Sequence, residues 1–446
     1  MDESRWAPRS SKPLAGRVAG RGGFDSHALP PKLLSDDRNR YLAMQTFTEN
    51  QEQITSLVNR VLTVASITIG DHTENVLVRY RGQLRIDSTQ AYDQLAAALQ
   101  QYNITPLFRE EEGQHVIVLL EGVLNPTPSN PVVNLVLFIL TVLSVLFAGA
   151  LYSYEGPVPE NQIEVITVLL RNLKVGIPFA ASILAILLAH EFGHYLAARY
   201  HKSAVTLPYF IPFPLSLFGT MGAFIQLKAP PKNKRILHDI GVAGPLAGLV
   251  VTIPILLIGL ALSPVDVISK VIPENSGFIL EGNSIFYLFA KYVIHGELLP
   301  APQSYQGMSP VLYWIRYLFT GHPLPLGGRD VMMHPMAWAG WAGLLVTALN
   351  LIPAGQLDGG HALYVLFGKK ARRLLPVILI SLTLLGLVWS GWWLWVALIF
   401  FLGQRHAEPL DQITKLNPWR KAIAISALVI FVLIFTPIPL QQIVGG

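Results

Sequence analysis

The sequence predicts a polytopic α-helical membrane protein with about six or seven transmembrane helices, a re-entrant hairpin and a small α+β N-terminal soluble domain. Three observations predict this class. The 446 residues are 52% hydrophobic and only 14% charged, whereas soluble globular proteins carry about 25% charged residues. Several uncharged runs are long enough to cross a hydrocarbon core of about 30 Å at a rise of about 1.5 Å per residue. A more polar region with alternating hydrophobicity precedes these runs.

The amino-terminal part divides into two regions. Residues 1–44 are rich in Ser, Gly, Pro and Arg without an apolar period, which predicts a disordered tail. Residues 45–125 contain the alternating stretch NVLVRYRGQLRID and the amphipathic stretch STQAYDQLAAALQQY, and Glu112-Gly113 separates two apolar segments. This pattern predicts a small α+β soluble domain with a hairpin at that dipeptide. The region carries no catalytic constellation, so we expect it to be a regulatory or docking module.

Apolar segments follow and form a predicted membrane domain over residues 131–441. They lie at 131–154, from about 175 through the motif described below, and at 240–265, 331–353, 374–403 and 422–440. Segment 374–403 is long for one crossing, and Ser390-Gly391 in its middle allows a hairpin of two short helices. Residues 203–227 are uncharged but contain Pro208, Pro212 and Pro214. Because proline at this density breaks helices, they predict a re-entrant hairpin that protein must shield from lipid.

The charges predict an orientation. Basic residues gather between 199 and 235, between 369 and 373, and between 405 and 421, and basic loops face the cytoplasm in most membrane proteins. Glu281 and Lys291 interrupt the patchily apolar residues 276–320, which predicts an external segment with interfacial helices. The soluble domain then lies on the cytoplasmic side. The net charge is only +5; we interpret it as orienting charge within a lipid bilayer and expect no nucleic-acid partner.

The second apolar segment contains the stretch LLAHEFGHYLAARY, which places His190, Glu191 and His194 within five positions. One ionisable residue at mid-bilayer costs about 2.5–3.5 kcal/mol, so three together indicate a function. Histidines four residues apart share a helical face and can hold one ion. Glu191 can then reach a water on that ion as a general base, the arrangement of His-Glu-x-x-His zinc proteases. The alternative is a chance match to this pattern in a helix.

A third metal ligand is expected from another segment, because catalytic zinc usually has three protein ligands. The chain has no cysteine, which leaves histidine and carboxylate. Asp358, in the stretch NLIPAGQLDGGHAL, is the only carboxylate between Asp330 and Glu408, and Pro353 breaks the preceding helix. As alternatives, Asp358 caps a short helix over 359–367, or His361 is the ligand.

Two further features border this predicted site. Asn350 is either a donor to the substrate or to a developing oxyanion, or a polar residue hydrogen-bonded within the bundle. The stretch GVAGPLAGL at 241–249 is rich in small residues and predicts close helix packing; it could also border the site.

The paired motifs resemble the site-2 protease family of intramembrane zinc metalloproteases. The family pattern is His-Glu-x-x-His on one span and Asn-x-x-Pro-x(4)-Asp-Gly on a later one, and the latter matches Asn350, Pro353, Asp358 and Gly359. The stretches GTMGAFIQLK and GVAGPLAGL also look like family segments. The resemblance covers roughly residues 131–441, and the amino-terminal domain looks closest to the branch of chloroplast EGY-like proteases and their bacterial relatives.

The resemblance implies a zinc metalloendopeptidase that cleaves transmembrane segments of single-span membrane proteins. It implies one Zn²⁺ per chain held by His190, His194 and Asp358, with Glu191 as the base. It also implies an integral, multi-pass location in a bacterial plasma membrane or a thylakoid or plastid membrane, with the amino-terminal domain on the cytoplasmic or stromal side. Segment 266–330 is too short for the PDZ domain of many bacterial members, so gating by such a domain is not expected.

Other classes of function remain open from the sequence. A non-catalytic zinc-stabilised scaffold or chaperone would keep the metal without cleavage. An ion transporter would also place ionisable residues in the membrane, although a pathway needs no general base beside two histidines. A membrane zinc protease that trims prenylated proteins would need a glutamate as third ligand, and no suitably placed glutamate follows residue 297.

Overall fold

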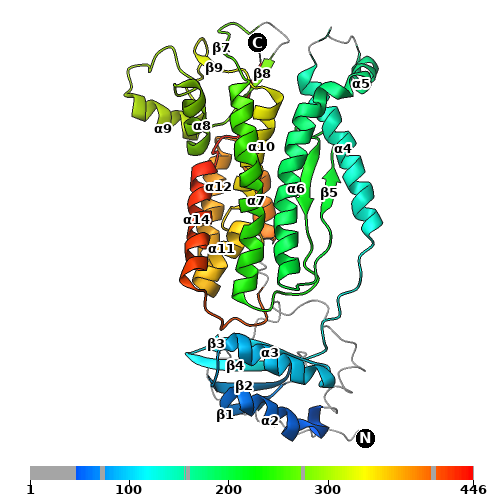
Figure 1. Ribbon diagram of the computed structural model, residues 1–446. Helices are drawn as coiled ribbons and strands as arrows, with labels where there is room; N and C mark the ends of the chain where they lie inside the picture. Colours follow the sequence, from blue (N-terminus) through cyan, green and yellow to red (C-terminus); the bar gives the residue numbers. More distant parts are fainter. Residues whose placement is uncertain are drawn as a thin grey trace, which may run out of the picture.

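The computed structural model describes residues 47–70, 76–154, 156, 161–272, 277–402 and 408–444. The predicted tail over residues 1–44 lies outside the described residues. A bundle of helices stands above a small unit that combines one sheet with helices. The carboxyl-terminal strand lies at the opposite end of the molecule from that unit (Figure 1).

The amino-terminal unit is a four-stranded sheet with two helices. The strands have the order β1-β2-β4-β3, and each neighbouring pair is antiparallel. Its elements are α2 (Gln51–Val61), β1 (Leu62–Ile69), β2 (Val76–Leu84), α3 (Ser88–Leu99), β3 (Ile104–Glu111) and β4 (Gln114–Glu121). The two residues between β3 and β4 have positive φ angles, 53° at Glu112 and 77° at Gly113, as a two-residue hairpin turn with the right-handed strand twist requires.

Three helices among the described residues are long and apolar enough to cross a membrane. They are α4 (Pro131–Ser153), α6 (Ile177–Tyr200), which continues a short 3₁₀ turn from Leu173, and α7 (Lys234–Ala261). Helix α5 (Gln162–Arg171) joins the first two. The remaining apolar segments form shorter helices, namely α10 (Pro335–Asn350), α12 (Leu375–Gly386), α13 (Trp392–Leu402) and α14 (Pro418–Ile434).

The shorter helices end where proline or glycine interrupts them. Helix α10 has 16 residues and ends at Asn350, three residues before Pro353, and not at residue 353 as expected. Helix α14 has 17 residues and ends at Ile434, so the expected segment 422–440 is helical only in its first part. The long run 374–403 forms the two helices α12 and α13, which pack against each other on either side of Ser390-Gly391.

The proline-rich segment forms a strand hairpin beside the bundle. Strands β5 (Tyr209–Pro212) and β6 (Thr220–Phe224) pair antiparallel, and the hairpin lies between α4 and α6 (Figure 1). Asn134 of α4 donates hydrogen bonds to the carbonyls of Leu207 and Pro208, and Ser144 of α4 donates to that of Gly219. Helix α4 thus satisfies backbone acceptors of a non-helical segment, as an apolar environment demands.

The far end of the bundle holds short strands and two amphipathic helices. These elements are β7 (Val265–Val267), β8 (Gly277–Glu281), α8 (Ile285–His295), α9 (Pro310–Thr320), β9 (Arg329–Val331) and β10 (Leu440–Val444). Helix α11 (Asp358–Phe367) lies lower in the bundle (Figure 1). Strand β8 pairs with β10 and β7 pairs with β9. The side chains of Glu281 and Lys291, which interrupt the apolar residues of this predicted external segment, are both buried.

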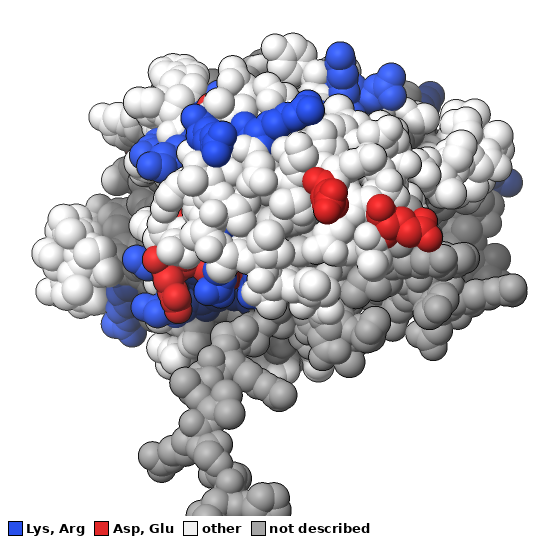
Figure 2. Space-filling model, turned by 90° about the horizontal axis from the view of Figure 1, so that it is seen from below, with Lys and Arg blue, Asp and Glu red and all other residues white. Residues whose placement is uncertain are grey.

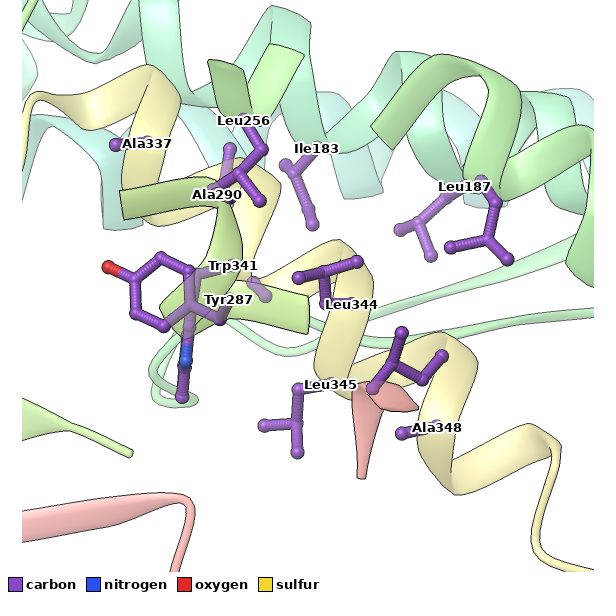
Figure 3. Packing of buried hydrophobic residues seen from close by; sticks show 14 of the residues in the cluster. Ile183, Leu187, Leu256, Tyr287, Ala290, Ala337, Trp341, Leu344, Leu345 and Ala348 are labelled. Atoms are coloured by element: carbon purple, nitrogen blue, oxygen red, sulfur yellow. The ribbon is translucent and has the colours of Figure 1, made fainter. Parts of the chain in front are cut away.

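One apolar core joins helices far apart in the sequence. Figure 3 shows Leu187 of α6, Leu256 of α7 and Tyr287 of α8 gathered around Trp341 and Leu344 of α10. These side chains are all nearly inaccessible to solvent. The core fixes α10 against α6 and α7, and α10 leads directly into the connection that carries Asp358.

The amino-terminal unit contacts the bundle through a strap at residues 408–416. Phe108 of β3 donates its N–H to the carbonyl of Leu410, and Gln412 donates to that of Phe108. The buried guanidinium of Arg109 donates to the carbonyls of Pro409 and Leu410 at 3.2 and 2.8 Å. The other edge of the strap bonds to the residues that lead into α7, because Asp411 donates to the carbonyl of Lys232 at 2.7 Å.

Candidate metal centre

Helix α6 presents two imidazoles on one face. His190 and His194 are four residues apart and both are buried, and their Nε2 atoms lie 3.2 Å apart. The Nδ1 atom of His194 lies 2.7 Å from the carbonyl oxygen of Ile240 on α7. Because a carbonyl only accepts, Nδ1 carries the proton and Nε2 offers a lone pair, the tautomer that a metal ligand needs.

The structure brings Asp358 to these two imidazoles. Its Oδ2 atom lies 3.4 Å from Nε2 of His190 and 3.3 Å from Nε2 of His194. Asp358 is the first residue of α11, and the N-cap position belongs to Leu357, which makes no side-chain capping bond. The carboxylate therefore points at the histidines of a helix more than 160 positions earlier in the chain and does not cap its own helix.

A tight connection places Asp358 at this depth. Between α10 and α11 the chain turns through Pro353 and through Gly355, whose φ is 57°. A Cβ on Gly359 would lie 1.9 Å from the carbonyl oxygen of Leu351. Because no side chain fits there, glycine after the aspartate lets α11 begin against the end of α10.

Two further predicted residues border the same point. The Nδ2 atom of Asn350 lies 3.5 Å from Nε2 of His190, so the last residue of α10 faces the cluster. Glu191 is buried and accepts a hydrogen bond from the backbone of Ile225, directly after β6. The carboxylate proposed as a base therefore lies between the histidine pair and the hairpin. His361 is only partly buried and packs against Gly241 of α7.

Glycines of α7 make room for the imidazoles. A Cβ on Gly244 would lie 2.0 Å from Nε2 of His194, and one on Gly248 would lie 3.3 Å from Nδ1 of His190. Helix α6 also has a glycine that faces α7. A Cβ on Gly193 would lie 2.6 Å from the carbonyl oxygen of Ala243. The small residues at 241–249 therefore pack the helices closely and also form one wall of the cluster.

The three groups suit one divalent metal ion. One ligand atom from each of His190, His194 and Asp358 lies within 4.8 Å of the other two, and in the part of the chain that the structure describes no other such group of His, Asp and Glu is found. Two imidazole nitrogens and one carboxylate oxygen are donors that Zn²⁺ accepts, and three protein ligands leave one coordination position open. The orienting bond from His194 to Ile240 is the kind of support that metal-ligating histidines almost always have.

Comparisons with known proteins find a peptidase family and proteins named as zinc metalloproteases. Residues 178–387 match the model of peptidase family M50. The chain is 32% identical over 328 residues to the rice (Oryza sativa subsp. japonica) protein named "Probable zinc metalloprotease EGY1, chloroplastic", covering 69% of this chain and 50% of that protein. It is 30% identical over 322 residues to the Arabidopsis thaliana protein of the same name, covering 69% and 53%.

A third relative extends the match further along the chain. The Oryza sativa subsp. indica protein named "Probable zinc metalloprotease EGY2, chloroplastic" is 26% identical over 390 residues, which cover 81% of this chain and 62% of that protein. The chain thus spans about half to three fifths of the length of these curated relatives. No solved structure matches it at a significant level.

Proposed function

We propose that this chain, which belongs to peptidase family M50, is a zinc-dependent intramembrane protease that hydrolyses peptide bonds in transmembrane segments of membrane proteins. One observation carries the proposal. Two buried imidazole nitrogens and a carboxylate oxygen converge within 3.4 Å of one another, directly beside a second buried carboxylate.

Each residue then has a role that its position supports. His190, His194 and Asp358 would hold one Zn²⁺, which when bound supplies Lewis acidity toward a peptide carbonyl and activates water. Glu191 would accept the proton of the attacking water and return it to the leaving amine. Asn350 would donate from Nδ2 to the substrate carbonyl as negative charge develops on it. Pro353 and Gly359 would hold Asp358 in place through the turn between α10 and α11.

The proposed substrate is a single-span membrane protein. The cluster lies on a helix long and apolar enough to cross a membrane, so a peptide bond must reach it at membrane depth. The hairpin β5–β6 lies next to Glu191, and an extended peptide could add to its edge by backbone pairing. We infer a multi-pass protein with about six or seven spans, in which the shorter helices and the α12–α13 hairpin complete the membrane domain.

The proposed location is a plastid or bacterial membrane, with the amino-terminal unit on the cytoplasmic or stromal side. Plastid location rests on the word "chloroplastic" in the names of the relatives. Orientation rests on Arg199, Lys232, Lys234 and Arg235, which lie at the end of the bundle beside that unit. On the face seen from below, the basic side chains gather apart from most of the acidic ones (Figure 2).

We further propose that a cytoplasmic-side regulator acts on residues 45–125. The strap at 408–416 supports this, because it bonds to β3 on one side and packs Leu416 against α11 on the other. A regulator that moves the sheet would thereby move the helix that carries Asp358. If deletion of residues 47–121 left the rate of cleavage in vesicles unchanged, this role would be excluded.

Glu191→Gln tests the proposed activity. Cells would express the natural chain or this variant, and peptides released from membrane proteins would be compared by mass spectrometry. The proposal predicts peptides that accumulate only with the natural chain, while purified Glu191→Gln protein keeps its zinc because Glu191 is not a ligand. The same peptides with both chains would support a zinc-stabilised scaffold, and ion flux into vesicles without cleavage would support a transporter.

A further inference from the structure

A second polar cluster lies at the end of the bundle beside the amino-terminal unit, where α6 ends and α7 and α14 begin. Its hub is Asp239 near the start of α7. Arg420 of α14 donates to both carboxylate oxygens, from Nε at 2.8 Å and from Nη2 at 2.7 Å. His201, just after α6, lies with Nε2 3.0 Å from Oδ2, and Nδ1 of His238 lies 2.9 Å from Oδ1. Because a carboxylate only accepts, all four contacts are donated to Asp239.

This hub ties three helices together at one height. Arg420 and its neighbours belong to the first turn of α14, His201 follows the last residue of α6, and Asp239 belongs to α7. A bidentate guanidinium–carboxylate pair fixes orientation as well as distance. The ends of α6, α7 and α14 are therefore held in one register by a single side chain.

Asp239 is connected to His194 through Ile240, the next residue of the chain. Ile240 follows Asp239, and its carbonyl oxygen accepts the Nδ1 proton of His194 at 2.7 Å. A shift or rotation of α7 at Asp239 moves that carbonyl. The imidazole of His194 would then turn, and its Nε2 atom would leave the position 3.3 Å from Asp358.

Asp239 is also connected to Asp358, because its partner Arg420 belongs to α14 and α14 packs against α11. Ala424, one turn after Arg420, packs in a buried cluster with Ala362, Tyr364 and Val365 of α11 and with Leu237 of α7. Helix α11 begins at Asp358. The position of α14 against α7 therefore sets where α11 lies, and with it the carboxylate ligand.

We propose that Asp239 is a positioning residue for the metal centre, which sets the orientation of His194 through Ile240 and the place of Asp358 through Arg420 and α14. The inference rests on the proposed function, because it presumes that these residues bind a metal. Asp239 touches neither the metal ligands nor a substrate, so its effect must appear in metal affinity and not only in turnover.

Asp239→Asn is the direct test. The amide keeps the shape of the side chain but replaces one accepting oxygen with a donor, which then faces a donor of His201 or Arg420. The dissociation constant for Zn²⁺ would be measured on the full chain in detergent by competition with a chromophoric chelator. We expect an increase of about 10- to 100-fold, the usual effect of losing support around a metal ligand. The visible spectrum of the Co²⁺-loaded protein should change as well.

Asp330→Asn is the matched control. Asp330 is likewise a carboxylate beside a cation, and it is more buried than Asp239, but it lies at the far end of the bundle. Both variants should lower the unfolding midpoint of the metal-free protein, whereas only Asp239→Asn should weaken zinc binding. If Asp239→Asn does not fold, Arg420→Lys serves instead, since lysine keeps the charge but loses the bidentate contact.

The possible outcomes separate this inference from the proposed function. Zinc affinity within twofold of the natural chain in Asp239→Asn or Arg420→Lys overturns the positioning role and leaves the proposed function intact. An equal loss of affinity in Asp330→Asn also overturns it, since the effect is then general destabilisation. A natural chain that binds no zinc overturns both.

Discussion

Two clusters of ionisable residues within the same helix bundle differ in the groups that balance their charge. At the far end, Lys291 lies with Nζ 3.7 Å from Glu281 and 3.5 Å from Asp330. It also lies 4.5 Å from the centre of the Tyr287 ring. In the second cluster, partway along α6, Asp358 has as its ion-pair neighbours, among the described residues, only the two imidazoles of His190 and His194.

The presence or absence of a protein cation distinguishes a structural cluster of ionisable residues from a metal site. The Lys291 cluster contains its own cation, and the Tyr287 hydroxyl donates to Glu281 at 3.0 Å. The Asp358 cluster instead gathers acceptors, because the proton on Nδ1 of His194 is already given to a backbone carbonyl. Buried charge alone therefore does not mark a functional site. Acceptors that converge without a protein cation are the specific signal.

Gly244→Ala should have the largest effect on this contrast. The added methyl group would lie 2.0 Å from Nε2 of His194, so the imidazole must leave the cluster. We expect the purified variant to contain little or no zinc and to show no cleavage. Metal analysis of the folded, monodisperse fraction is the measurement.

Gly248→Ala is a milder variant to compare with Gly244→Ala. Its methyl group would lie 3.3 Å from His190, a contact that a small shift relieves. Zinc content near that of the natural chain is expected. Equal zinc content in both alanine variants would show that Gly244 does not border the metal site.

Lys291→Met should have the next largest effect, on stability and not on metal binding. Removal of one partner from a buried ion pair costs about 3–5 kcal/mol, because the remaining carboxylates are left uncompensated. Denaturant unfolding of detergent-solubilised protein measures this cost, and zinc per folded chain should not change. A variant as stable as the natural chain would contradict the account of Lys291 as the cation of its cluster.

The smallest expected effect is a pH dependence of stability that arises at the same far cluster. Burial and the neighbouring carboxylate of Asp330 raise the pKa of Glu281 to about 7, against the opposing charge of Lys291. The folded protein then binds this proton more tightly than the unfolded chain does. The associated stability is present in full below about pH 4.5 and is lost as the pH rises towards 7.

At about 1.4 kcal/mol per pKa unit, the total change from this group is at most about 3.5 kcal/mol. Glu281→Gln keeps the side chain neutral and should remove this part of the pH dependence. Unfolding midpoints between pH 4.5 and 7.5 measure it. Parallel profiles for the natural chain and Glu281→Gln would show that Glu281 titrates normally.

Much of the metal centre could be predicted from local sequence. His190 and His194 share a face because a helix repeats every 3.6 residues, and ionisable groups in an apolar run are costly enough to be informative. Asp358 could be singled out because it closes an apolar run of the chain almost free of carboxylates. The spacing of the histidines and the apolar residues around each ionisable group can be read directly from the sequence.

Contacts between distant segments could not be predicted in the same way. Gly244 was expected to pack helices, but its position in front of His194 depends on the crossing of α6 and α7. Asp239 and Arg420 lie 181 positions apart, and neither stands out within its own segment. That Lys291 and Glu281 would be buried together could not be predicted for the same reason, since their partner Asp330 comes from another element.

The amino-terminal unit shows a related limit. Alternation and the Glu112-Gly113 turn predict its strands, because these signals are local. That residues 408–412 bond to the edge of β3 has no local signal, since the bonds are made by backbone groups and by Arg109. Helix α3 begins at Ser88, and the side chain of Asp87 caps it by accepting a hydrogen bond from the N–H of Thr89.

X-ray absorption at the zinc edge of the purified natural chain, with metal analysis of the same sample, would show directly whether His190, His194 and Asp358 hold zinc. We expect one zinc ion per chain with two imidazole nitrogens and carboxylate oxygen as protein ligands, and loss of that zinc in Asp358→Ala. A chain without stoichiometric zinc, or one whose zinc signal is unchanged in Asp358→Ala, would contradict it.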